Sequence, residues 1–144
     1  MKLKNKVAVI TGSGSGIGRA CAIEFAKAGA EVVVADINLE GAQETVRKIQ
    51  SINGTAMAIK TDVAQPESVI HLVELTIKAY SKIDTLVNDA AIQINKTIEH
   101  TTFLEWNQQI SINVGGIFLC SKYFLPYLRE TKGSIVNMSS VNGY

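Results

Sequence analysis

The sequence predicts an α/β fold, in which helices cover both faces of a doubly wound parallel sheet. Two observations support this prediction. Short β-branched, apolar runs alternate with longer stretches of helical period along the chain. The runs are apolar almost without interruption, as expected of strands with both faces buried. Such an alternation calls for right-handed crossovers and places a ligand at the carboxyl ends of the strands.

Five segments are expected to form strands, because each is short, apolar and bounded by polar or glycine residues. They are KVAVIT (6–11), EVVVAD (31–36), TAMAIK (55–60), IDTLVN (83–88) and SIVNMS (134–139).

Helical periods fill the segments between these strands. Residues 16–29 and 39–49 each place apolar side chains on one face. Residues 103–128 are largely helical, with an interruption at Gly115-Gly116. Trp106 and Ile110, one turn apart, are expected to pack rather than to form a substrate platform. Pro66 opens one more helix, and its inner face is expected to be Val69, Leu72, Val73 and Thr76.

Length and composition limit the possible functions. The chain of 144 residues, 47% of them hydrophobic, suits one domain, 1–144, with its own core. Fourteen basic and thirteen acidic residues leave a charge of +1 without a basic run, so no nucleic-acid partner is expected. The first apolar run, 7–10, is too short for a signal peptide or a membrane span. We expect a soluble, cytoplasmic protein.

Cysteines and histidines give no sign of a metal site. Cys21 and Cys120 stand alone in helical stretches and are expected to pack as small apolar residues. His71 and His100 are also isolated, without a second ligand at metal spacing. No metal is therefore expected.

A glycine-rich loop joins the first predicted strand to the first helix. In TGSGSGIG, residues 11–18, the glycines at 12, 16 and 18 fall where a tight turn and close approach to a phosphate require residues without a Cβ. The helix beyond offers unpaired N–H groups and a partial positive charge to a pyrophosphate. No Gly-Lys-Ser/Thr follows, which argues against a P-loop. A purely structural turn is the alternative.

Asp36 ends the second predicted strand. A carboxylate at this place accepts hydrogen bonds from an adenosine ribose and repels a 2′-phosphate. No Arg or Lys stands at 13–15 or 37 to receive such a phosphate. The sequence therefore favours NAD over NADP, although Asp36 is also compatible with a simple turn at 36–38.

Together these motifs resemble the short-chain dehydrogenase/reductase family, which has a Rossmann-type fold, and the resemblance runs along all 144 residues. TGSGSGIG resembles its cofactor loop and Asp62-Val63 its adenine-contacting pair. NDAA (88–91) stands where the family usually has NNAG, so that Asp89 and Ala91 depart from the pattern. The implied cofactor-binding residues are Thr11, Gly12, Ser15, Gly16, Ile17, Gly18, Asp36, Ile37, Asp62, Val63, Asn88 and Ala90.

Two of these residues have alternative roles. The Thr11 hydroxyl either braces the loop or faces the cofactor. Asn88 either binds the cofactor or satisfies buried backbone groups between strands.

The resemblance also implies hydride transfer between a nicotinamide and an alcohol or carbonyl carbon. INVGG (112–116) resembles the segment with the family's catalytic Asn, here Asn113, and SIVNMSS (134–140) resembles the strand that ends in its catalytic Ser, here Ser140. In the family a Tyr exchanges the hydroxyl proton, with its pKa lowered by a neighbouring Lys. The Ser orients the substrate oxygen, and the Asn holds a water that links the Lys to solvent.

The family's Tyr-x-x-x-Lys is expected well past Ser140, whereas the sequence continues only to Tyr144. Tyr144 is a poor candidate for the acid/base, because geometry precedes pKa in choosing such a group. We expect a domain truncated on its carboxyl-terminal side, inactive alone, whose full-length form is a homo-oligomeric oxidoreductase. The alternatives are a non-catalytic module that binds a dinucleotide or a partner, and an enzyme reassembled from two chains.

Overall fold

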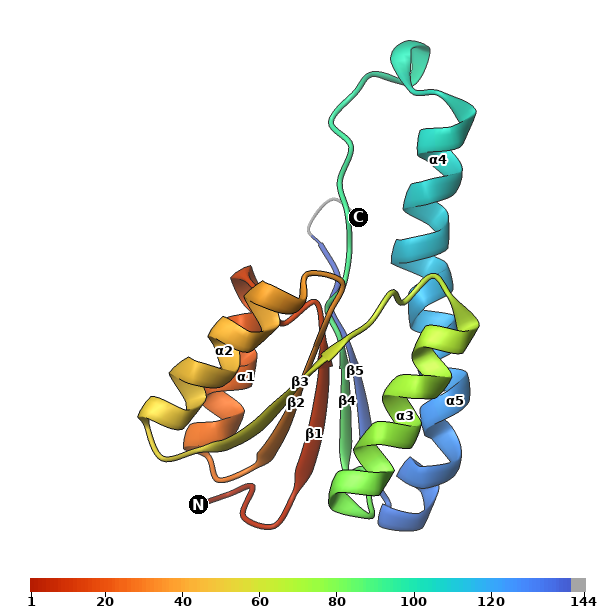
Figure 1. Cartoon of the computed structure of the whole chain (residues 1–144). Helices are drawn as coiled ribbons and strands as arrows, with labels where there is room; N and C mark the ends of the chain where they lie inside the picture. The colour runs from red at the N-terminus through yellow and green to blue at the C-terminus, as the bar shows by residue number, and fades with distance from the viewer. Residues whose placement is uncertain (141–144) are drawn as a thin grey trace.

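The computed structural model describes residues 1–140 and contains one parallel sheet in the order β3-β2-β1-β4-β5. Figure 1 shows the sheet between two layers of helices. The strands are β1 (Val7–Thr11), β2 (Glu31–Asp36), β3 (Thr55–Lys60), β4 (Thr85–Asn88) and β5 (Ser134–Asn137). The predicted α/β fold, a doubly wound parallel sheet of the Rossmann type, is confirmed.

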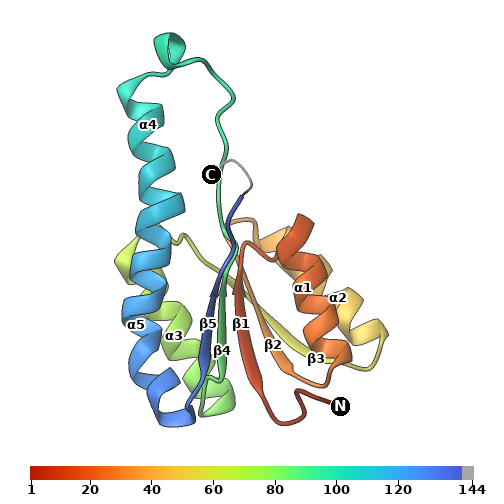
Figure 2. The same ribbon diagram turned by 180° about the vertical axis from the view of Figure 1, so that it is seen from behind.

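The helices divide between the two faces of the sheet. α1 and α2 cover one face, and α3 and α5 cover the other (Figures 1 and 2). A 3₁₀ turn (Ile98–His100) precedes α4, and a π-helix (Ser111–Gly115) joins α4 to α5. The helices are α1 (Gly16–Lys27), α2 (Leu39–Ser51), α3 (Pro66–Tyr80), α4 (Phe103–Ile110) and α5 (Gly116–Thr131).

Each face of the sheet has its own hydrophobic core, because successive strand residues point to opposite faces. Val9 and Leu86 pack with Phe124 on the α3/α5 side, whereas Ile10 packs with Ala22 on the α1/α2 side. The buried face of α3 is the predicted one: Val69, Leu72, Val73 and Thr76.

Cysteine packing follows the prediction as well. Cys120 is fully buried in the core on the α3/α5 side. Burial raises the pKa of its thiol to about 12, so the group is neutral and apolar in character. Cys21 is partly buried against the core on the other side of the sheet.

Three predicted strands are longer than the observed ones, the first only by Lys6, since β1 begins at Val7. The fifth was expected over 134–139 but ends at Asn137, because its partner β4 ends at Asn88, which is paired with Asn137. The fourth was expected from residue 83 but begins at Thr85, the first residue of β4 that pairs with β1. β5 forms one edge of the sheet, and all four of its residues are exposed.

The expectation that Trp106 and Ile110 pack is wrong for the part of the chain that the structure describes. Their side chains are 55% and 41% exposed, respectively. α4 extends past the carboxyl edge of the sheet (Figure 1), so no strand lies beneath it. Helical period shows which residues share a face, but not whether that face has a neighbour.

Among residues 1–140, no helix is both long and apolar enough to cross a membrane. The same residues contain no group of three His, Cys, Asp or Glu side chains arranged to hold a metal ion.

Candidate functional site

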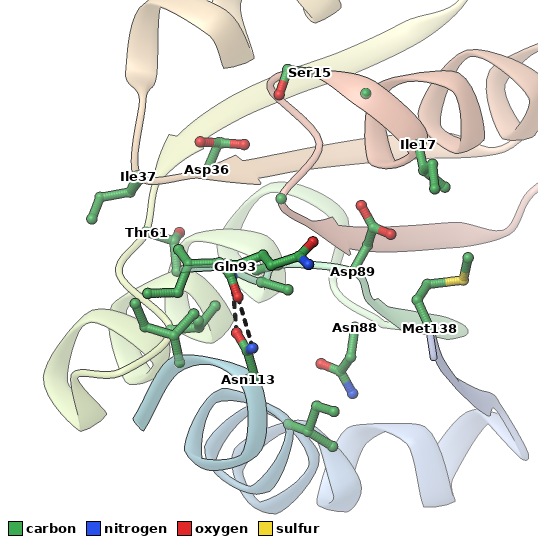
Figure 3. A pocket seen from close by; sticks show the side chains of 18 of the residues that line it. Ser15, Ile17, Asp36, Ile37, Thr61, Asn88, Asp89, Gln93, Asn113 and Met138 are labelled. Atoms are coloured by element: carbon green, nitrogen blue, oxygen red, sulfur yellow. Dashed lines mark hydrogen bonds between the residues drawn. The ribbon is translucent and has the colours of Figure 1, made fainter. Parts of the chain in front are cut away.

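A cleft of about 840 Å³ opens at the carboxyl ends of the strands (Figure 3). It lies between the loops that follow β1 and β4, where the strand order reverses. Ligands of doubly wound sheets bind at this point. Twelve of the fourteen predicted site residues line the cleft: Gly12, Ser15, Gly16, Ile17, Asp36, Ile37, Asp62, Val63, Asn88, Ala90, Asn113 and Ser140.

The glycine loop needs its glycines for two different reasons. Gly12 has φ +68°, and a Cβ there would lie 2.7 Å from Cα of Ala90, so that the loop could not pack against β4. Gly16 has φ +54°, but a Cβ there would meet no atom within 4 Å. The missing side chain of Gly16 therefore leaves open space beside the N-terminus of α1. A pyrophosphate fits such a space, where backbone N–H groups are unpaired.

Thr11 and Gly18, the two predicted residues outside the cleft wall, support it from behind. The Thr11 hydroxyl accepts hydrogen bonds from the N–H groups of Asp89 (3.1 Å) and Ala90 (3.2 Å). It therefore braces β1 against the loop after β4. Gly18 is buried, and a Cβ there would lie 2.5 Å from the carbonyl oxygen of Gly12. Its role is close packing of α1 on the loop, which explains why it does not reach the cleft.

Asp36 presents a carboxylate that the backbone holds in place. Its Oδ2 accepts a hydrogen bond from Gly14 N–H at 2.8 Å, and its Oδ1 accepts one from Asn38 N–H at 2.9 Å. Each carboxylate oxygen can accept more than one hydrogen bond, so both retain capacity for ligand hydroxyls. Ile37, beside it, is 60% exposed and offers an apolar surface at the same place.

Asp62 and Val63 follow β3 and form a further part of the wall. Asp62 Oδ1 accepts a hydrogen bond from Ala64 N–H at 2.9 Å, and the Asp62 N–H donates to the Ser68 hydroxyl at 2.9 Å. Val63 packs against α5 where Gly116 leaves room, since a Cβ on Gly116 would lie 2.7 Å from Val63 Cγ2. Gly116 thereby lets α5 approach this end of the sheet.

Asn88 ends β4, with 4% of its surface exposed. Its Nδ2 donates to Asn137 Oδ1 on β5 at 2.8 Å, which links the two strands through their side chains. Its Oδ1 is buried and has no hydrogen-bond partner within residues 1–140. A buried acceptor is rarely left unpaired, so Asn88 combines a link between strands with spare hydrogen-bonding capacity at the cleft.

Asn113 lies in the π-helix between α4 and α5. Its Nδ2 donates to the carbonyl of Ile92 at 2.8 Å, and its Oδ1 accepts from the N–H of Ile92 at 2.9 Å (Figure 3). The amide thus pairs with both backbone groups of one loop residue. Because a π-helix widens the helical turn locally, it presents the side chain of Asn113 to this loop.

Ser140 lines the cleft three residues beyond the end of β5, on the same side as Met138 and Ser139. Asn113 and Ser140 thus contribute to a single cleft from separate elements. Tyr144, the poor candidate for an acid/base, lies outside the described residues.

The charged side chains that line the cleft are all acidic in the part of the chain that the structure describes. They are Asp36, Asp62 and Asp89. Arg19 of α1, the nearby cation, points elsewhere: its Nε donates to Thr45 Oγ1 at 3.0 Å, and an Nη donates to the carbonyl of Gly14. Within residues 1–140 the cleft wall therefore presents three carboxylates and no cation.

Asp89 is the functional candidate that sequence reasoning missed. In the sequence it is only a departure from the NNAG pattern, because its contact with α1 depends on β1 and β4 being neighbours, which a local pattern cannot reveal. Burial raises the pKa of its carboxyl group, against the smaller, opposing effect of a hydrogen bond from Gly18 N–H. Other cleft residues that sequence reasoning did not single out include Thr61, Gln93, Gln108, Ile112 and Ile117.

A protein-family model described as short chain dehydrogenase matches residues 6–144. The chain belongs to the short-chain dehydrogenase family. The glycine loop, Asp36, Asn113 and Ser140 thus lie in one cleft of a fold that the family shares.

Individual relatives agree with this assignment. The chain is 37% identical to meso-2,3-butanediol dehydrogenase of Serratia marcescens, over 99% of this chain and 56% of that protein. It is 39% identical to cyclohexanol dehydrogenase of Acinetobacter sp. (strain SE19), over 99% of this chain and 57% of the relative. A crystal structure of a hydroxysteroid dehydrogenase from Escherichia coli superimposes with a TM-score of 0.92 at 34% identity, covering 96% of this chain and 59% of the other. The short-chain dehydrogenase chain described here thus spans little more than half the length of these relatives.

Proposed function

We propose that this protein is an NAD-dependent oxidoreductase that transfers hydride between nicotinamide and an alcohol or carbonyl substrate. The observation that carries the proposal is the cleft, in which the glycine loop, the fixed carboxylate of Asp36 and the polar groups of Asn113 and Ser140 lie together. Relatives named as dehydrogenases of a diol and of cyclohexanol support the substrate class.

NAD is preferred over NADP in this proposal because of Asp36. Its two oxygens, held by the N–H groups of Gly14 and Asn38, are placed to accept hydrogen bonds from a ribose diol. A 2′-phosphate would meet the same carboxylate as a like charge, and the cleft wall within residues 1–140 offers no cation to offset it.

The two predicted catalytic residues, Ser140 and Asn113, each have a task in the proposal. The bound dinucleotide supplies or accepts the hydride. Ser140 orients the substrate oxygen by a hydrogen bond, and Asn113 holds the loop at Ile92 against the π-helix. The Tyr-x-x-x-Lys pair that exchanges the proton lies past Tyr144 in this proposal, which makes residues 1–144 the cofactor-binding part of a longer, homo-oligomeric enzyme.

The test compares binding of NAD and NADP to the wild type and to Asp36→Ala by calorimetry. The loss of two charge-assisted hydrogen bonds, each of about 1.5–3 kcal/mol, predicts at least a tenfold weaker affinity for NAD. Affinity for NADP should fall less, because the substitution also removes the repulsion between the Asp36 carboxylate and the 2′-phosphate. The exposed Glu74 of α3 provides the matched control, Glu74→Ala, which should leave both affinities unchanged.

Equal losses for NAD and NADP would show that Asp36 serves only the loop structure and would refute the cofactor preference. Failure of the wild type to bind either dinucleotide would refute the proposed function. Binding of NAD without hydride transfer, in a polypeptide that carries Tyr-x-x-x-Lys, would favour the non-catalytic module.

A further inference from the structure

Asp89 places a second carboxylate beside the glycine loop, next to the N-terminus of α1. It follows β4 directly, and its own N–H donates to Thr11. Its side chain turns towards α1: a Cβ on Gly18 would lie 2.7 Å from Asp89 Oδ2. Figure 3 shows this carboxylate in the cleft, near Ile17 of the first helical turn.

The contact has a structural benefit. Ser15, the N-cap residue of α1, makes no side-chain capping hydrogen bond. Asp89 accepts a hydrogen bond from Gly18 N–H instead, so it satisfies a first-turn donor from a different strand. A carboxylate at a helix N-terminus is favourable, so the position of Asp89 has a structural reason of its own.

At the same position, the charge of Asp89 would repel the phosphates of a bound dinucleotide. In the proposed complex the pyrophosphate lies at the Gly16 end of the loop, where an added Cβ would meet no atom within 4 Å and the helix N-terminus offers unpaired N–H groups. Asp89 occupies the Gly18 end of the same helical turn. Two phosphate charges and a carboxylate would then share one helix N-terminus in a half-buried site, where charges are screened less than in water.

We propose that Asp89 is a second determinant of cofactor affinity, whose charge opposes the pyrophosphate, so that the protein takes up a proton at Asp89 when it binds the dinucleotide. This inference rests on the proposed function. Asp89 would act on the pyrophosphate of the bound dinucleotide, whereas Asp36 would bind its ribose.

The surroundings of Asp89 favour uptake of the proton at this group. β1 presents the Thr11 hydroxyl to the residue, and α1 presents the Gly18 N–H. Within residues 1–140, burial and the Gly18 hydrogen bond are the causes that shift the pKa of Asp89, and burial, the larger, raises it. The cation of α1, Arg19, is directed towards Gly14 and α2.

Other titratable groups can be separated from Asp89 by the choice of probe. Asp36 and Asp62 also line the cleft, whereas His71 and His100 do not. Adenosine carries the ribose that Asp36 would bind but no phosphate. ADP-ribose adds the pyrophosphate. Because ADP-ribose also adds a second ribose, a pH dependence that ADP-ribose shows and adenosine lacks reports on the part of the cleft beyond the adenosine, and Asp89→Asn then tests whether Asp89 causes it.

The experiment measures binding of ADP-ribose and adenosine by calorimetry between pH 5 and pH 8. We expect the wild type to bind ADP-ribose about three- to tenfold more tightly at pH 5 than at pH 8. Asp89→Asn keeps a side-chain oxygen for Gly18 N–H. It should bind ADP-ribose at pH 8 at least as tightly as the wild type does at pH 5, without pH dependence. Glu74→Gln, the surface control, should behave like the wild type.

The outcomes are distinct. A flat pH profile of ADP-ribose binding to the wild type would overturn the inference without any variant. So would a profile that Asp89→Asn shares with the wild type, since another group would then take up the proton. If ADP-ribose and adenosine both fail to bind, the proposed function fails. If both ligands bind and ADP-ribose binding does not depend on pH, the proposed function is supported and the proposed role of Asp89 is refuted.

Discussion

At the scale of single residues, carboxylates at opposite ends of the sheet serve different purposes. Asp36 lies at the carboxyl edge and keeps hydrogen-bonding capacity for a ligand. Asp84 lies at the other edge, 5% exposed, and its capacity is taken up by the protein. It accepts hydrogen bonds from Lys6 Nζ at 2.8 Å and from Val7 N–H at 2.9 Å, and Lys82 Nζ lies 3.1 Å away. The role of an Asp therefore depends on the groups that contact it and cannot be read from the residue type alone.

The environment of Asp84 predicts a pH-dependent contribution to stability. Burial alone would raise the pKa of Asp84, but the hydrogen bonds from Lys6, Val7 and Lys82 outweigh it and lower the pKa. A lowered pKa in the folded state stabilises the protein above the pKa of an unfolded Asp, about 3.9. That contribution is lost as the pH falls through the folded-state value.

Asp84→Asn should therefore destabilise the protein at pH 7 by about 1–3 kcal/mol, because Val7 N–H and two lysines lose a charged partner. The difference from the wild type should begin to shrink below about pH 4, where Asp84 of the unfolded chain takes up a proton, and should shrink further as the pH falls through the lower folded-state pKa. Urea unfolding at pH 7 and pH 3.5 measures both quantities. A difference that stays constant across this range would show that the charge of Asp84 contributes nothing.

At the scale of elements, the loop between β1 and α1 contains one glycine that is expected to matter for stability and another that is expected to matter for binding. Gly12 and Gly16 both have positive φ, which costs other residues about 1–2 kcal/mol. Only at Gly12 would a Cβ also collide with the backbone of Ala90. The two glycines thus offer a matched pair of substitutions in one loop.

Gly12→Ala should lower the stability clearly more than Gly16→Ala, because it adds the collision to the φ penalty of about 1–2 kcal/mol. Gly16→Ala should instead weaken NAD binding strongly, since its methyl group fills the space left for the pyrophosphate. Thermal unfolding and NAD calorimetry on both variants test this contrast. Unchanged NAD affinity in Gly16→Ala would remove Gly16 from the binding surface.

At the scale of the whole molecule, local patterns and the family resemblance predicted the sheet and twelve of the residues that line the cleft, but not how distant elements meet. The face of α3 could be predicted because its period lies within fifteen residues. The exposure of Trp106 could not, because it depends on whether a strand lies beneath α4. The contact of Asp89 with Gly18 likewise arises from the pairing of β1 with β4. Contacts that depend on tertiary neighbours leave no periodic trace in the sequence.

The central claim, that NAD binds at the carboxyl edge of this sheet, is tested most directly by hydrogen exchange of the backbone amides with and without NAD. With NAD bound, exchange should be slower in residues 12–18, 36–37 and 88–93, which come from three separate strand ends. Exchange in α3 should be unchanged. Protection confined to other segments, or exchange that NAD leaves unchanged in all three, would contradict it.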